Sequence, residues 1–93
     1  MIDVKQAIRA AAAFVAEIFS DEKLLDVRFE EVELTEDEKT WLITLSLLRK
    51  QKATTGLADA WSDAGGRMER EYKILAVESE TGRVRSMKIR QVL

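Results

Sequence analysis

Two glutamates at alternate positions offer the most direct suggestion of chemistry in this sequence. Glu31 and Glu33 lie in an extended segment, so both side chains project from the same side of it. Paired carboxylates can bind a divalent cation or divide acid and base roles. No third ligand lies near them in the sequence, and charged residues usually cover the solvent side of a strand, so we favour a solvated surface. The run Glu36-Asp37-Glu38 lacks the spacing and central glycine of a calcium-binding loop, and we interpret it as a turn.

Basic residues mark the last segment of the chain and suggest phosphate contacts. They are Arg83, Arg85, Lys88 and Arg90. The chain has an isoelectric point near 5.2 and no aromatic residues between these positions, which disfavours nucleic-acid binding. Charges on an edge strand also prevent sheet-to-sheet aggregation, and we favour that role. The glycines at 56, 65 and 66 lack the lysine and the spacing of a phosphate-binding loop.

The composition narrows the chemistry further, because the 93 residues include neither cysteine nor histidine. This excludes disulfides, thiolate metal sites and cysteine nucleophiles, and it removes the commonest general base. We therefore expect a protein that is not an enzyme and that uses no metal and no cofactor. Neither a signal peptide nor an apolar run of membrane-spanning length is visible, so we expect a cytoplasmic protein without membrane contact.

Charge is distributed unevenly within the small net charge of −2. Residues 1–48 carry 11 acidic and 5 basic side chains, whereas residues 49–93 carry 6 acidic and 10 basic ones. Such polarity could steer a partner during association. The simpler interpretation is that strands with solvent faces of opposite sign happen to lie in the two halves.

The chain as a whole reads as a single α+β domain over residues 1–93. Asp3 with Gln6 resembles a capping box, and the apolar period that follows predicts a helix over 3–20. Alternating patterns predict strands over 27–34, 40–50, 67–78 and 83–92. The apolar positions of the first strand change parity at Glu30-Glu31, which predicts a β-bulge there. Gly82 is expected at positive φ in the last turn.

These elements predict a helix packed on a four-stranded antiparallel meander of order 1-2-3-4. The two central strands are apolar on both faces, but one helix covers one face. We expect Leu42, Leu48, Leu75 and Val77 on the uncovered face. The loop 51–66 could cover them with Leu57 and Trp61, a partner protein or a second copy could do so, or they could stay partly exposed. Trp61 would then be either a core plug or a partner anchor.

Residues 72–84 resemble the closing hairpin of PepSY-type domains. In YKILAVESETGRV an aromatic-led strand enters a short acidic turn that ends in Thr81-Gly82, followed by a valine. The order upstream is similar, with a helix containing Gln6-Ala7-Ile8 and a strand containing Trp41. The resemblance implies the same fold and a non-catalytic binding role, inhibitory in many such domains, and it implies no active-site residue.

We therefore predict a non-enzymatic protein-binding or regulatory module whose partner is another protein or a second copy. Its interface candidates are Trp61, Leu57, Leu42, Leu48, Leu75 and Val77. The alternative is a small-molecule-binding domain or enzyme with a pocket between helix and sheet, using Tyr72 or a buried carboxylate.

Overall fold

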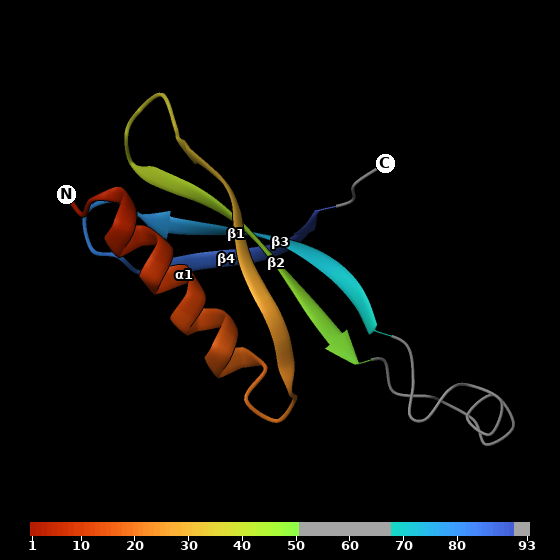
Figure 1. Ribbon diagram of the computed structural model, residues 1–93. Helices are drawn as coiled ribbons and strands as arrows, with labels where there is room; N and C mark the ends of the chain where they lie inside the picture. The colour runs from red at the N-terminus through yellow and green to blue at the C-terminus, as the bar shows by residue number, and fades with distance from the viewer. Residues whose placement is uncertain (51–67, 91–93) are drawn as a thin grey trace, which may run out of the picture.

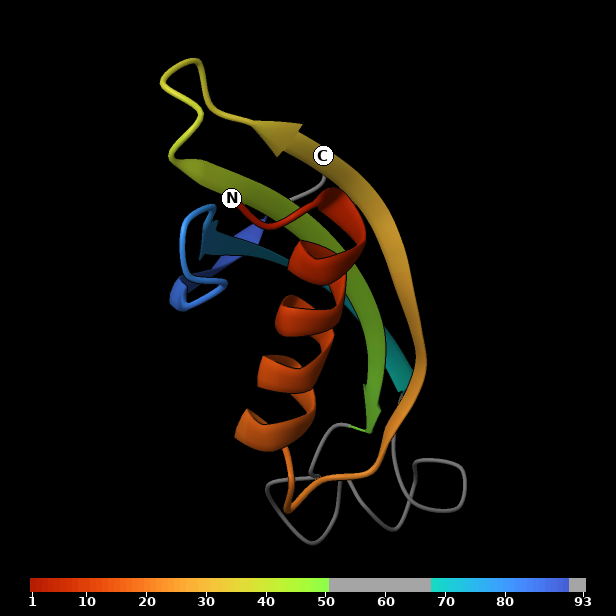
Figure 2. The same cartoon turned by 90° about the vertical axis from the view of Figure 1, so that its left-hand side faces the viewer.

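The computed structural model describes residues 1–50 and 68–90, and in these residues it has one helix and four strands (Figure 1). The elements are α1 (Val4–Ile18), β1 (Leu24–Leu34), β2 (Thr40–Lys50), β3 (Met68–Glu78) and β4 (Val84–Arg90). The strands form one antiparallel sheet of order β1-β2-β3-β4, and α1 lies across one face of it (Figure 2). The predicted α+β meander is confirmed.

The start of α1 is fixed by the capping box that the sequence predicts. The Asp3 carboxylate accepts a hydrogen bond from the Gln6 amide at 2.8 Å, and the Gln6 side-chain oxygen accepts one from the Asp3 amide at 2.9 Å. These bonds satisfy two backbone donors that a helix terminus otherwise leaves free. The buried side of α1 consists of Ala7, Ala11 and Val15. Because two of the three are alanine, the helix backbone lies close to the sheet.

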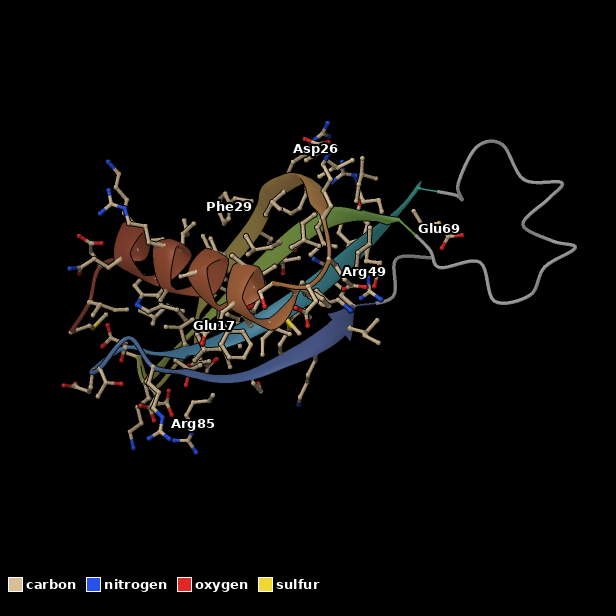
Figure 3. All side chains as sticks on the ribbon, turned by 90° about the horizontal axis from the view of Figure 1, so that it is seen from below. Glu17, Asp26, Phe29, Arg49, Glu69 and Arg85 are labelled. Atoms are coloured by element: carbon tan, nitrogen blue, oxygen red, sulfur yellow. The ribbon has the colours of Figure 1, made fainter. Side chains whose placement is uncertain are left out.

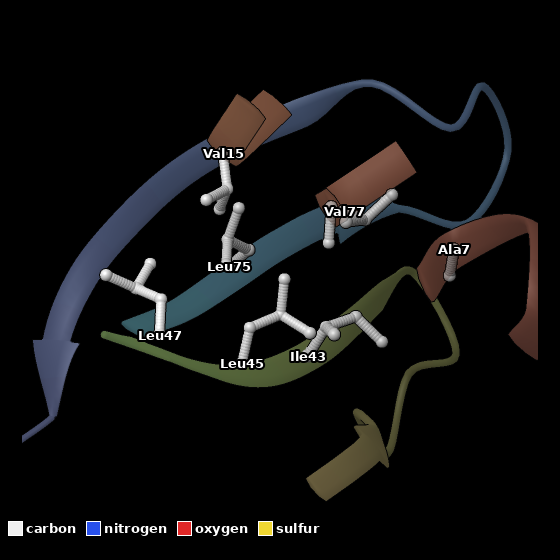
Figure 4. Close-up of a cluster of buried hydrophobic side chains, with 8 residues drawn as sticks. Ala7, Val15, Ile43, Leu45, Leu47, Leu75 and Val77 are labelled. Atoms are coloured by element: carbon white, nitrogen blue, oxygen red, sulfur yellow. The ribbon is translucent and has the colours of Figure 1, made fainter. Parts of the chain in front are cut away.

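The core lies between α1 and the two central strands (Figure 4). Ile43, Leu45 and Leu47 of β2 and Leu75 and Val77 of β3 are at most 2% exposed. The placement of Leu75 and Val77 corrects the prediction that they lie on the uncovered face. Residues paired across a ladder share a face, and the register pairs Leu75 with Ile43. The sequence alone does not determine which side of β3 faces the helix, because residues 74–77 are apolar at both odd and even positions.

Strand β1 contains the predicted bulge and a second irregularity. Phe29 pairs with Leu45 while Glu31 pairs with Thr44, so Glu30 is the extra residue. The bulge returns Phe29 and Val32 to the face that carries α1, as predicted from the parity change. A second register shift lies between Leu25 and Arg28, where Asp26 has a φ of 49°. The strand begins at Leu24, three residues before the predicted start.

The N-terminal residues are bound to one end of the sheet, where β2 begins and β3 ends. The Ile2 amide donates to the Ser79 carbonyl at 2.7 Å, and the Trp41 indole donates to the Ile2 carbonyl at 3.3 Å. Gly82 has a φ of 78° in the β3–β4 turn, as predicted. The interface candidates Leu57 and Trp61 lie outside the described residues, as does the predicted end of the last strand at 91–92.

Candidate functional site: the uncovered face of the sheet

The sheet face opposite α1, hereafter the open face, carries the even-numbered side chains of the two central strands. Its central rows are formed by Leu42, Thr44, Ser46 and Leu48 of β2 and by Arg70, Tyr72, Ile74 and Ala76 of β3, and Glu78 of β3 lies at its end. Leu42 and Leu48 lie here as predicted, and both are partly buried. Ile74 and Ala76 take the positions that we had assigned to Leu75 and Val77. No described segment crosses this face in Figures 1 and 2.

A polar network lies at the Ser46 end of the open face. The Ser46 hydroxyl is fully buried, donates to a Glu30 carboxylate oxygen at 2.6 Å and accepts from the Arg70 guanidinium at 2.7 Å. Arg70 also pairs with the Asp26 carboxylate, which binds Arg28 at 2.8 Å. These hydrogen bonds and charges, from Arg28 above all, lower the pKa of Asp26. Glu30 and Asp26 reach this network because both lie at the irregularities of β1.

An ion pair spans the centre of the open face from one edge strand to the other. Glu31 of β1 and Arg90 of β4 are joined at 2.5 Å. Beside it lies a hollow of about 230 Å³, lined by Glu31, Glu33, Leu42, Thr44, Ile74 and Arg90. The hollow is open to solvent and combines an apolar floor with charged walls, a lining suited to a side chain of a binding partner.

Glu31 and Glu33 share the open face beyond the bulge, since they pair with Thr44 and Leu42. The two carboxylates that suggested a cation site therefore do lie together. Within residues 1–50 and 68–90, however, no group of three or more acidic, histidine or cysteine side chains is placed to hold a metal ion. What the pair contributes to the described surface is negative charge.

The two edges of the open face carry charges of opposite sign. The β1 edge presents four carboxylates and one guanidinium, from Asp26, Arg28, Glu30, Glu31 and Glu33. The β4 edge presents Arg85, Lys88 and Arg90. Figure 3 shows Asp26 and Arg85 at opposite sides of the sheet. Arg85 pairs with Glu78 at 2.6 Å, and the hydrogen bonds from Thr81 and then Arg85 lower the pKa of Glu78.

A second ionic cluster lies on the other face, beyond the C-terminal end of α1. Arg49 interacts with Glu22 at 3.5 Å and Glu71 at 3.4 Å, and its guanidinium lies 4.9 Å from the centre of the Phe19 ring. Glu71 also pairs with the largely buried Lys73 at 3.3 Å. Each charge in this cluster has a partner within the chain, so we assign it to closing the end of the core.

Comparisons with known proteins give no match: no family model, no curated protein and no solved structure is significantly similar to the chain. In the described part of the chain, no helix has the length and apolarity needed to cross a membrane.

Sequence reasoning missed Tyr72, Ile74 and Ala76 as members of the open face. The signal that could have found them is the register between β2 and β3. Thr44 and Ser46 are the polar positions of β2, which marks their side as the less buried face. Residues paired across the ladder share a face, so the β3 residues that pair with Thr44 and Ser46, at even positions, lie on this less buried face.

Proposed function

We propose that this protein is a non-enzymatic protein-binding module and that the open face is its binding surface. The observation that carries the proposal is the apolar strip along β2 and β3, with charged side chains on both sides. Leu42, Leu48, Tyr72 and Ile74 are only partly buried, and Leu25 beside Leu48 is 40% exposed. An apolar centre within a polar rim is the usual anatomy of a protein interface.

Two observations favour binding over catalysis. The Ser46 hydroxyl donates a hydrogen bond to Glu30 and accepts one from Arg70. These bonds give it a structural role in the sheet and do not resemble those of a nucleophile. Tyr72, the residue suggested for a pocket between helix and sheet, pairs with Ser46 and therefore belongs to the open face. The resemblance of residues 72–84 to PepSY-type domains, and the inhibitory role it implies, stay predictions.

The proposal is tested by site-specific photo-crosslinking in the cells that produce the protein. A photoreactive phenylalanine analogue replaces Ile74 at the centre of the open face. In the matched control it replaces Ile89, which is 73% exposed and pairs with Lys73 on the helix side of the sheet. We expect a discrete protein adduct from position 74 and none from position 89. Equal adducts from both positions, or none from position 74, would contradict the proposal.

A further inference from the structure

We infer that the partner of the open face is a second copy of this chain, packed face to face about a two-fold axis parallel to the strands. The inference rests on the proposed function and names its partner. It is argued from the order of charge across the sheet, from the sizes of the paired side chains and from the area of the face.

Across the open face, the charge of the side chains changes from negative on β1 to positive on β4. The face side chains of β1 sum to −3, from four carboxylates and the Arg28 guanidinium. Those of β4 sum to +3, from Arg85, Lys88 and Arg90. From Leu42 to Leu48 the face residues of β2 are uncharged, and on β3 the charges of Arg70 and Glu78 cancel. The charges named here sum to zero, and they give the face an acidic edge and a basic edge.

A two-fold axis parallel to the strands lays β1 of each copy over β4 of the other. Acidic and basic edges then meet twice, as the symmetry of an isologous dimer requires. A two-fold axis in the sheet plane but across the strands would lay β1 on β1 and β4 on β4. That arrangement opposes charges of like sign at both edges, so the charge order selects the first axis.

Side-chain size alternates in a way that fits the same axis. Three successive rows across the two central strands each join one large and one small side chain. The register pairs Leu42 with Ala76, Ile74 with Thr44, and Tyr72 with Ser46. The parallel axis lays β2 of one copy over β3 of the other, so in these three rows each large side chain meets a small one. Such interdigitation is how two sheets fill the space of about 10 Å between them.

The area of the face suits a dimer of standard size. Three strands of eleven residues and one of seven, about 4.8 Å apart and rising about 3.3 Å per residue, cover about 630 Å². Stable interfaces bury about 800 Å² per partner. In this dimer Glu31 lies in the row of Lys88 of the second copy, because Thr44 pairs with Glu31 on one side and Ile74 with Lys88 on the other. Within one chain Glu31 pairs with Arg90 across the same face at 2.5 Å, so dimer formation exchanges this ion pair for the contact with Lys88.

Sedimentation equilibrium on the full chain tests the inference directly. We expect a monomer–dimer equilibrium that weakens as salt is added, because the edges pair by charge. Ile74→Glu should raise the dissociation constant at least about tenfold, as the loss of a central interface residue does. Ile89→Glu makes the same chemical change on the opposite face and should leave the dissociation constant unchanged. Circular dichroism confirms that each variant is folded.

A charge exchange supplies a second test that does not alter the apolar strip. Glu31→Lys and Lys88→Glu should each self-associate more weakly than the natural chain, because each creates two like-charge contacts per dimer. Mixed together, the two variants should form a heterodimer visible by native mass spectrometry, since both contacts regain opposite signs. A natural chain that stays monomeric at every concentration, or variants that do not combine, would overturn the inference.

The two proposals fail separately. A crosslink from position 74 to a different protein, with a monomeric chain in sedimentation, keeps the binding function and removes the second copy as its partner. A crosslink to the same chain supports both.

Discussion

At the scale of single residues, the backbone is most constrained where φ is positive. Gly82 adopts a φ of 78° in the β3–β4 turn, and Asp26 and Glu38 adopt 49° and 58°. The sequence predicts Gly82 because glycine after a short acidic turn is a common turn signal. It does not predict Asp26, because aspartate occurs in many conformations. The Asp26 carboxylate binds two guanidinium groups at this bulge, contacts that arise only in the folded chain.

Gly82→Ala should lower the free energy of unfolding by about 1–2 kcal/mol, the cost of an L-residue in the left-handed region. Sterics add little, since a new Cβ would lie 3.6 Å from the Ile2 side chain, an ordinary contact. Gly82→Asn should cost less than Gly82→Ala, because asparagine tolerates this region. Urea unfolding measures both. An alanine variant as stable as the natural chain would contradict the assigned turn conformation.

At the scale of elements, the sequence predicts the helix, the strand order and the bulge at Glu30, because each has a local signal. Helical period marks α1, and the parity change marks the bulge. The faces of β3 could not be predicted from its own pattern. Residues 74–77 are apolar at both parities, so the register with β2 decides that Leu75 is buried and Ile74 is not.

Alanine substitutions at two adjacent positions of β3 test which of its faces packs against the helix. Leu75→Ala should lower the free energy of unfolding by about 2–5 kcal/mol, because it leaves a cavity under α1. Ile74→Ala should cost less, because Ile74 is partly exposed on the open face. Chemical denaturation at a concentration where the chain is monomeric separates the two. If Ile74→Ala were the more destabilising of the two, the assignment of Leu75 to the helix-covered face would be contradicted.

At the scale of the whole molecule, the sequence predicted that one face of the sheet is uncovered, but it identified only the residues that β2 contributes to that face. Leu42 and Leu48 were placed correctly, and the charge polarity of the two halves was visible in the sequence. The halves were read as solvent faces of opposite sign. The structure assigns the charges to two edges of a single face, β1 and β4, which only the strand order can reveal.

Ion pairs at both ends of the sheet also set how the molecule responds to acid. Hydrogen bonds and nearby cations lower the pKa of Asp26, Asp37 and Glu78 below their ordinary values of 3.8, 3.8 and 4.5. A carboxyl with a lowered folded pKa contributes stability above its unfolded value and loses it as the pH falls through the folded one. The free energy of unfolding should therefore decline below about pH 4.5. It should be nearly level from about pH 6 to 8, since the chain has no histidine or cysteine.

Glu78→Gln tests the origin of this decline. The variant keeps the shape of the side chain but loses the charge that Arg85 and Thr81 stabilise, so it should be less stable than the natural chain near neutral pH. As the pH falls, the natural chain loses the same contribution, and the two stabilities should converge below about pH 4. Glu36→Gln, in the exposed β1–β2 turn, makes the same change of net charge and leaves these contacts intact. Urea titrations at a series of pH values compare the three chains, and a Glu78→Gln curve parallel to that of the natural chain would contradict the assignment.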